Sequence, residues 1–264
     1  MATMRIALSI AGSDPTGGAG IQADLQVFRQ LKTHGCGVIS ALTVQDTRGV
    51  KSVLPAFPSV VLDQLRVLLA DLQPDAIKIG MLASDDVLRS VALGLEAIPS
   101  EVPIVLDPVL MASDGSVLLE RRAWPALRDL LPKVQLVTPN LSEAEALTEV
   151  GTSTRTGAEA AARILVEEIG VPAALIKGGH RDGKPDDLLA LREPSGTSLQ
   201  WLESERIDAG AVHGTGCSLS SAIAAKLAHG ETLPDAVHAA RLFVSEALGR
   251  AEKRGNGSAF LVYS

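Results

Sequence analysis

One glycine-rich stretch organises this chain: His213-Gly214-Thr215-Gly216-Cys217-Ser218. The alanine-rich segment that follows carries Leu219, Ile223 and Leu227 at helical spacing, which predicts that the glycines lie at the N-terminus of a helix. Such an end presents unpaired backbone N–H groups and the positive pole of the helix dipole. The stretch therefore predicts a site for a phosphate group or a developing oxyanion.

The same stretch allows two interpretations. Gly214 and Gly216 have no Cβ atom, so the backbone can approach an anion closely at both positions. The helix dipole is also expected to favour the thiolate form of Cys217 in the first turn. In the alternative interpretation the glycines only cap the helix, and Cys217 packs as a small buried hydrophobic residue. The stretch alone leaves both open.

The composition indicates one domain over residues 1–264, because a chain of this length with 46% hydrophobic content can bury a sizeable core. Only 3% of the residues are aromatic, which suits buried parallel strands covered by Ala-rich helices. The net charge of -7 excludes a nucleic-acid footprint, and no apolar run of about 18 residues could span a membrane. Cys36 and Cys217 cannot form the disulfide framework of a secreted protein, which indicates a cytoplasmic location.

Apolar runs of strand length alternate with helical patterns as far as about residue 180, which predicts an α/β fold with a mostly parallel central sheet. The expected strands are Arg5–Ala11, Gly37–Val44, Ala76–Ile79, Ile104–Leu106, Gln135–Val137 and Ala174–Lys177, with an antiparallel extension at Asp187–Leu191 and Leu199–Leu202. The expected helices are Ala19–Leu31, Ser59–Leu72, Asp85–Ala97, Arg121–Leu131, Ser142–Thr148, Gly157–Ile169, Gly216–His229 and Pro234–Glu252.

Ligands bind beyond the carboxyl ends of the strands in an open parallel sheet. The segments that follow the expected strand ends should therefore line one rim together with the turn before the last two helices. These segments are Gly12–Gly20, Gln45–Gly49, Gly80–Met81, Asp107–Pro108, Thr138–Asn140 and Gly178–His180.

Two glycine motifs at this rim match known phosphate-binding loops only in part. Gly18-Ala19-Gly20-Ile21-Gln22-Ala23 fits the dinucleotide pattern G-x-G-x-x-A, but six residues separate it from the strand end, whereas that fingerprint lies in the tight turn itself. The segment from Gly178 to Lys184 begins like a P-loop, but Pro185 replaces the Ser or Thr that would hold magnesium. A dinucleotide dehydrogenase and a P-loop enzyme are therefore disfavoured.

Four polar residues near the rim each allow a structural and a functional interpretation. Asn140 and Glu143 fit a capping box at a helix start, and they also offer the oxygen atoms that a magnesium-nucleotide site needs. Lys177, at a strand end, is placed either to meet a phosphate or to extend its side chain to solvent. Asp24 is either part of a ligand site or a surface acid that complements a helix dipole.

Taken together, these segments resemble the hydroxymethylpyrimidine/phosphomethylpyrimidine kinases of thiamine biosynthesis, in the ribokinase-like superfamily. The similarity extends from about Met4 to Gly249. The residues that carry it are Ala11–Asp14, Gly17–Asp24, Gln45–Val50, Lys78–Leu82, Asp107–Val109, Thr138–Asn140 with Glu143, Lys177–His180 and His213–Ser218.

The resemblance implies a three-layer α/β/α fold, a homodimer, and phosphoryl transfer from ATP with Mg²⁺ to the pyrimidine's hydroxymethyl group and then to the resulting monophosphate. The implied substrate contacts are Gly12, Asp24, Gln45 and Met81. The residues implied for the magnesium ion are Asp107, Asn140 and Glu143, and those for the nucleotide are Lys177 and Thr138. The implied anion hole is Gly214, Thr215 and Gly216, with Cys217 at the position of the base.

Two alternatives stay open beside this resemblance. A pyridoxal or pyridoxine kinase would share the fold, although Gln45 favours an aminopyrimidine, because a carboxamide can donate to a ring nitrogen and accept from an exocyclic amine. A module that senses the pyrimidine without turnover is the other alternative. The chain departs from the family pattern at Asp208–Val212, and in the tail, where Gly255-Asn256-Gly257-Ser258 replaces the usual Gly-His-Gly.

Overall fold

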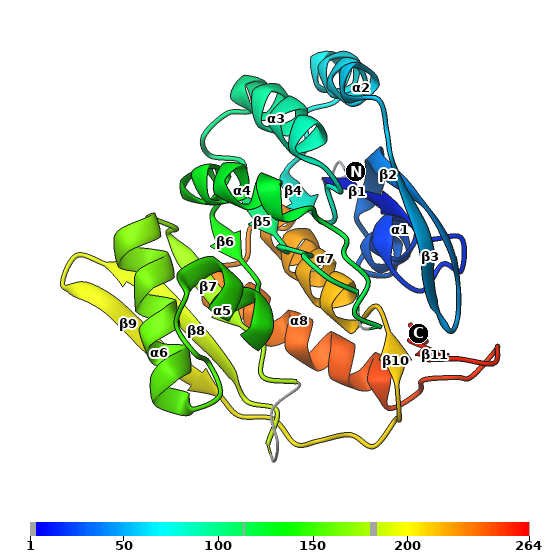
Figure 1. Ribbon diagram of the computed structural model, residues 1–264. Helices are drawn as coiled ribbons and strands as arrows, with labels where there is room; N and C mark the ends of the chain where they lie inside the picture. Colours follow the sequence, from blue (N-terminus) through cyan, green and yellow to red (C-terminus); the bar gives the residue numbers. More distant parts are fainter. Residues whose placement is uncertain (1–3, 113, 180–183, 264) are drawn as a thin grey trace.

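A β-sheet runs through the computed structural model, which describes residues 4–112, 114–179 and 184–263 (Figure 1). Within these residues the sheet has nine strands in the order β3-β2-β1-β4-β5-β6-β7-β8-β9. Their bounds are β1 Ile6–Ser13, β2 His34–Asp46, β3 Gly49–Pro55, β4 Ala76–Ile79, β5 Ile104–Leu106, β6 Leu136–Val137, β7 Ala173–Ile176, β8 Asp187–Glu193 and β9 Gly196–Leu202. A separate parallel pair consists of β10 Val212–His213 and β11 Ala259–Phe260.

Strands β2, β1, β4, β5, β6 and β7 pair in parallel, whereas β3, β8 and β9 are antiparallel additions at the two edges. The predicted mostly parallel sheet and its antiparallel extension are confirmed. Strand β3 was not predicted, because the segment Gln45–Gly49 was expected to be a rim loop. Instead the chain reverses after Asp46, whose Oδ1 atom accepts a hydrogen bond of 2.9 Å from the Arg48 amide and so stabilises a tight turn.

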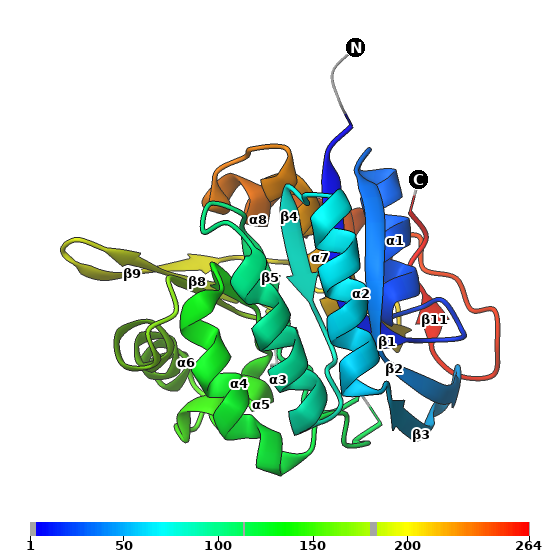
Figure 2. The same ribbon diagram turned by 90° about the horizontal axis from the view of Figure 1, so that it is seen from above.

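Helices cover both faces of the sheet and give the expected three layers (Figure 2). One face carries α2 Pro58–Asp71, α3 Asp85–Gly94, α4 Trp124–Leu130, α5 Leu141–Thr148 and α6 Arg155–Arg163. The other face carries α1 Gly20–Gln30, α7 Thr215–Ala228 and α8 Leu233–Leu248. Short 3₁₀ segments lie at Leu95–Ala97, Arg121–Ala123 and Leu131–Lys133, and a π-helical segment at Ile164–Ile169.

Helix α7 is buried along most of its length, between α1 and α8 (Figure 1). Its residues 218–225 are all buried, and apart from Leu219 and Ile223 they are Ser or Ala. Small side chains let this helix pack closely against β1, β4 and β5. The packing places the N-terminus of α7 at the carboxyl ends of the parallel strands, where the sequence predicted the rim.

The last helix is shorter than its sequence pattern predicts. Helix α8 ends at Leu248, and the residues up to Glu252, which were expected to continue it, turn back toward the tail. Glu252 forms an antiparallel bridge with Phe260 there. Across the described residues, each helix is too short or too polar to cross a lipid bilayer.

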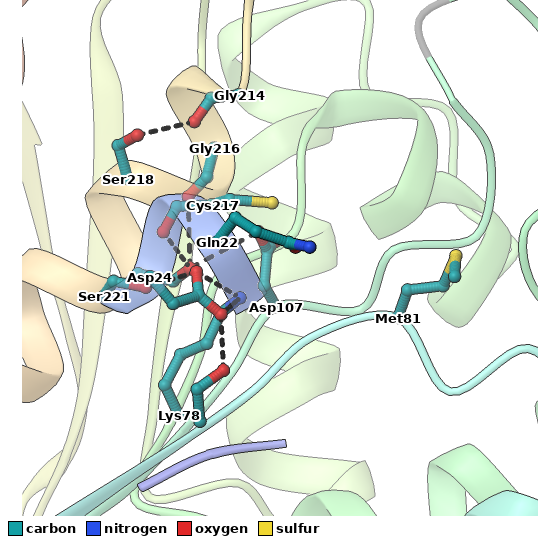
Figure 3. A network of polar contacts seen from close by, with 12 residues as sticks. Gln22, Asp24, Lys78, Met81, Asp107, Gly214, Gly216, Cys217, Ser218 and Ser221 are labelled. Atoms are coloured by element: carbon teal, nitrogen blue, oxygen red, sulfur yellow. Dashed lines mark hydrogen bonds and ion pairs between the residues drawn. The ribbon is translucent and has the colours of Figure 1, made fainter. Parts of the chain in front are cut away.

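A buried ion pair ties the sheet to two helices beneath the rim (Figure 3). Lys78 Nζ, on β4, donates to both carboxylate oxygens of Asp24, on α1, at 2.9 and 2.8 Å, and neither side chain is exposed. Ser9 on β1 and Ser221 on α7 donate to the same carboxylate at 2.6 and 2.7 Å. Burial by itself would lower the pKa of Lys78, but the negative charge of Asp24 and its neighbours raises that pKa above the usual value.

Lys78→Met should destabilise the protein by about 3 to 5 kcal/mol, because it leaves the Asp24 carboxylate buried without its partner. The double variant Lys78→Met with Asp24→Asn should recover part of this loss, since no uncompensated charge remains. Urea unfolding of the three proteins measures both differences. Equal losses in the single and double variants would show that side-chain shape, not charge, dominates at this position.

Candidate active site

The turn before α7 presents the backbone N–H groups that the sequence predicted as an anion site. Gly214 has a φ of 79°, and a Cβ atom there would collide with the Gly18 carbonyl group, so only glycine fits. The first helical hydrogen bond joins Ser218 N to Gly214 O at 2.9 Å. The three N–H groups between these two residues precede that bond and are directed out of the helix end, toward a potential ligand.

An ion pair lies beside this turn. Lys177 Nζ is 2.7 Å from Asp107 Oδ1, and the two residues directly follow strands β7 and β5. Gly216 lies against the pair, because a Cβ atom there would be 3.1 Å from Lys177 Nζ and 3.5 Å from Asp107 Oδ2. Thr138 and Ser220 donate to the Asp107 carboxylate at 3.2 and 3.5 Å. The structure therefore brings Asp107 and Thr138, from two predicted rim segments, together with Lys177 at the start of α7.

Both charges of this ion pair affect the pKa of the nearby Glu143 carboxyl group. Burial raises the pKa of Glu143 to about 7, an effect that Lys177 opposes and Asp107 strengthens. The Glu143 carboxylate accepts a hydrogen bond of 2.8 Å from Asn140 N, and Asn140 Oδ1 accepts one of 2.9 Å from Glu143 N. The predicted capping box at the start of α5 is confirmed.

Asp107 and Glu143 offer two carboxylates to a magnesium ion in this corner of the site. Over the part of the chain that the structure describes, no group of three or more His, Cys, Asp or Glu side chains could hold a metal by itself. Mg²⁺ is commonly held by one or two carboxylates together with substrate phosphates and water. The donor set therefore fits magnesium that arrives with a nucleotide. Asn140 Oδ1 is engaged in the helix cap, so we assign Asn140 to holding Glu143.

A cavity of about 430 Å³ opens beside Gln45, the residue expected to select the substrate. Its lining residues are Pro15, Thr16, Gln45, Asp46, Thr47, Arg48, Arg254, Gly255, Asn256 and Phe260. Gly12 and Met81 are not among the residues that line this cavity. They contact one another, since a Cβ atom on Gly12 would collide with the Met81 side chain. Met81 lies to one side of the polar network in Figure 3. The expected substrate contacts thus do not form one continuous lining.

Asp14 lies beside the Gln45 side chain. The Asp14 carboxylate accepts hydrogen bonds from Thr16 N at 2.8 Å and from Ala19 N at 2.9 Å, it lies 3.0 Å from His213 Nε2, and it interacts with the Gln45 side chain. Burial would raise the pKa of Asp14, but these hydrogen bonds outweigh burial and lower the pKa to about 2. An ionised carboxylate only accepts, so an interaction with Asp14 favours the Gln45 orientation in which Nε2 is directed at Asp14. In that orientation the Oε1 atom and the second N–H group would be available to a ligand.

Cys217 does not have the protonation state that the helix dipole predicted. Burial raises the pKa of the Cys217 thiol, the charge of Lys78 opposes the rise, and the charges of Asp24 and Asp107 add to it. Desolvation and nearby carboxylates thus outweigh the dipole. The expectation of a favoured thiolate is wrong, and the thiol is protonated at neutral pH.

Two expected ligand contacts are also wrong. Asp24 has no exposed surface, and Lys78, Ser9 and Ser221 occupy its carboxylate, so it supports the site from beneath (Figure 3). This burial equally excludes the alternative of a surface acid. Thr138 is fully buried and donates to Asp107, so it holds that carboxylate instead of a nucleotide.

Three further residues of the site, Lys78, Asp14 and His213, belong to the motifs quoted above but were given no individual role there. Lys78 did carry a signal, because a lysine inside an apolar strand requires a buried partner. Asp14 and His213 carried none, since they meet across 199 residues of sequence. His180 of the Lys177–His180 motif and Gly183 of the P-loop-like segment lie outside the described residues.

Comparison with known proteins shows the family to which this chain belongs. The family model described as phosphomethylpyrimidine kinase matches residues 14–261. The chain is 38% identical over 256 residues to the hydroxymethylpyrimidine/phosphomethylpyrimidine kinase of Staphylococcus aureus (strain MRSA252), an alignment that covers 96% of this chain and 91% of that protein.

Two solved structures are similar over nearly the whole chain. The pyridoxal kinase from Staphylococcus aureus in complex with ADP matches with a TM-score of 0.89 and 32% identity, covering 98% of this chain and 93% of that one. The phosphomethylpyrimidine kinase from Clostridium difficile 630 matches with a TM-score of 0.81 and 33% identity, covering 92% of this chain and 99% of that one.

The fold and the site define a kinase of the ribokinase-like superfamily. Within it, the chain belongs to the phosphomethylpyrimidine kinase family. The three-layer fold and the kinase class expected from the sequence are confirmed, and the ADP complex of the structural relative supports the use of an adenine nucleotide.

Glu143 should make the protein less stable as the pH rises from about 4.5 to about 7. Its folded-state pKa lies above the ordinary value of 4.5, so in this window the folded protein binds more protons than the unfolded chain. The stability that the protonated carboxyl contributes, on the order of 3 kcal/mol, is fully present below this window and is lost as Glu143 ionises.

Glu143→Gln stays neutral and keeps the length of the side chain, so it should flatten this part of the profile. Urea unfolding between about pH 4 and pH 8 measures the slope for both proteins. A variant with the same slope as the wild type would assign the pH dependence to another group.

Proposed function

We propose that this protein transfers a phosphoryl group from magnesium ATP to the hydroxymethyl group of an aminopyrimidine, and then a second one to the monophosphate so formed. One observation carries the proposal: the N-terminus of α7 meets the Lys177–Asp107 pair across Gly216. Backbone N–H groups and an ammonium group would there stabilise the negative charge that builds on the transferred group. The acceptor is taken from the named activities of the relatives.

Each charged residue would have a separate role in this transfer. Asp107 and Glu143 would hold the magnesium ion, which supplies positive charge to the phosphates when it is bound. Thr138 and Ser220 keep the Asp107 carboxylate in place. Burial would lower the pKa of Lys177, but Asp107 and Glu143 raise it, so its ammonium group stays charged for the nucleotide.

Acceptor recognition would depend on Gln45. Because Asp14 takes one N–H group of the amide, the other can donate to a ring nitrogen while Oε1 accepts from the exocyclic amine of the pyrimidine. Pyridoxal has no such amine. The similarity to a pyridoxal kinase nevertheless makes phosphorylation of pyridoxal the second candidate function.

Steady-state turnover with magnesium ATP and each acceptor tests the proposed function. The proposal requires ADP release with the hydroxymethylpyrimidine and with its monophosphate. Turnover with pyridoxal alone would favour the second candidate. Binding of the pyrimidine, measured by calorimetry, without ADP release would identify a sensing module.

Gln45→Met should lower the catalytic efficiency for the pyrimidine by about 5- to 150-fold, the equivalent of 1 to 3 kcal/mol for a ligand edge left unpaired. The catalytic efficiency for pyridoxine should change little, because pyridoxine lacks the exocyclic amine of the pyrimidine. Gln64→Met, on the exposed face of α2, is the matched control. Unchanged efficiency for the pyrimidine would remove Gln45 from the site.

Cys217 would accept the proton of the acceptor alcohol in the first transfer. Because burial raises the pKa of the thiol, only a small fraction is ionised at neutral pH, and the rate of the first transfer should rise with pH. The acceptor in the second transfer is a phosphate with a second pKa near about 6, so it is mostly a dianion and needs no base.

Cys217→Ala should therefore slow the first transfer by roughly 10²-fold or more and the second much less. It should also remove the rise of the first rate with pH. Gly216→Val should slow both transfers, since its side chain would displace the Lys177–Asp107 pair. Each transfer is assayed separately by supplying the alcohol or the monophosphate. Equal losses in both transfers for Cys217→Ala would show that the thiol contributes packing instead of base catalysis.

We also propose that residues 1–264 form one domain that assembles as a homodimer in the cytoplasm. The continuous sheet supports the single domain, and the free cysteines support a reducing compartment. Exposed apolar side chains on the β2–β3 hairpin and beside it support self-association; they are Ile39, Leu42, Val44, Leu54 and Phe57. Leu42 and Leu54 lie directly opposite each other across the hairpin.

A further inference from the structure

The C-terminal tail, residues 254–263, lies along the strand that leads into the anion-binding turn (Figure 1). Strand β11 of the tail runs parallel to β10, with Ala259 opposite Val212 and Phe260 opposite His213. Ala259 N donates to Ala211 O at 2.8 Å. The tail is therefore fixed to the segment that directly precedes Gly214.

The tail also holds the turn that follows Gln45. Ser258 N donates to Thr47 O at 2.8 Å, and Gly257 N donates to Thr47 Oγ1 at 3.0 Å. A Cβ atom on Gly255 would approach Thr47 Oγ1 to 2.6 Å, and one on Gly257 would collide with the Thr47 backbone. The Gly-Asn-Gly-Ser sequence of the tail thus has a physical reason, because its backbone packs directly on Thr47, two residues beyond Gln45.

The end of the tail contacts the first turn of α7. Tyr263 Oη lies 2.6 Å from Ser218 Oγ, and the Tyr263 ring stacks on Phe243 at a centroid distance of 5.5 Å. Ser218 Oγ donates its own proton to Gly214 O at 2.8 Å, so the tyrosine hydroxyl is the donor to Ser218. A continuous chain of hydrogen bonds therefore links the tail to the anion-binding turn.

Phe260 supplies an aromatic surface to the cavity beside Gln45. Its ring lies against Gly18 and His213, since a Cβ atom on Gly18 would be 2.7 Å from Phe260 Cδ1 and 2.8 Å from His213 Cδ2. The rest of the lining is mostly polar. A heteroaromatic acceptor has a polar edge and an apolar face, and an aromatic side chain is the natural partner for that face.

We infer that the tail is an acceptor-binding element, in which Phe260 packs on the ring of the acceptor and the Gly255–Ser258 backbone positions Gln45. The inference rests on the proposed function, because the acceptor is the aromatic alcohol proposed above. It assigns one side of the acceptor site to the tail, whose Phe260 pairs with His213 directly before the turn that leads to the phosphoryl-transfer centre.

Phe260→Ala should raise the KM for the hydroxymethylpyrimidine about tenfold, the usual size of one aromatic stacking contact, and leave the KM for ATP unchanged. Phe260→Leu keeps an apolar contact and should give a smaller rise. Gly257→Ala should also raise the KM for the acceptor, because it pushes the tail away from Thr47. Gly151→Ala, where an added Cβ atom would meet nothing within 4 Å, is the matched control.

Initial rates with each substrate varied in turn, together with thermal unfolding, decide the outcome. Wild-type turnover tests the proposed function separately from the tail. If the wild type phosphorylates the pyrimidine and both Phe260→Ala and Gly257→Ala keep its KM, the inference is overturned. A parallel rise of both KM values, with a lower melting temperature, would overturn it as well, because the tail would then be a structural strap alone.

Discussion

The buried charge pair between Lys78 and Asp24 is the interaction on which the arrangement of the site depends. Removing two charges from water is costly, and here the cost is offset because three elements supply partners to one carboxylate. Strands β1 and β4 and helix α7 each contribute a partner to the Asp24 carboxylate, which α1 carries. Any shift of α7 along the sheet would separate Ser221 from Asp24, so the network fixes the height of the anion-binding turn above the strands.

Above this network, the proposed transfer centre is built from opposed charges in close contact. Lys177 is neutralised by Asp107, and Glu143 and the Cys217 thiol are both shifted toward their protonated forms. Burial favours neutrality at each position when no ligand charge is present. A nucleotide phosphate would compete with Asp107 for Lys177, and a magnesium ion would favour ionised Asp107 and Glu143. Without ligands the site thus has a low net charge. Binding of the nucleotide and the magnesium ion would separate the charge of Lys177 from those of Asp107 and Glu143.

Different elements of the fold would make the proposed phosphoryl-transfer centre and the proposed acceptor-recognition surface. The first is made by strand ends and the start of α7, and the second by the β2–β3 turn and the tail. This division offers a physical reason why a pyridoxal kinase shares the fold so closely with this chain. Side chains on the outer turn and tail can change while the close backbone contacts around Gly214 stay as they are.

The sequence by itself determined the features that depend on local pattern. Strands β4 and β5 were predicted with their observed bounds, because strands buried on both faces are mostly apolar, and Lys78 is the one charged residue in these two. The capping box at Asn140 and the helix start after Gly214 follow from neighbouring residues alone. Strand β3 was not predicted because it is an edge strand with mixed polar and apolar residues, and its pairing depends on a turn held by one side chain.

Only the tertiary structure decided the properties that depend on distant partners. Asp24 and Thr138 have the residue types of ligand contacts, but the elements packed around them remove both from solvent. The Cys217 thiol lies in a helix turn that favours a thiolate, yet desolvation by the sheet outweighs that local field. The tail's contact with Thr47 joins residues about 210 positions apart in sequence. Burial and long-range contacts are properties of the packed chain, and no local pattern encodes them.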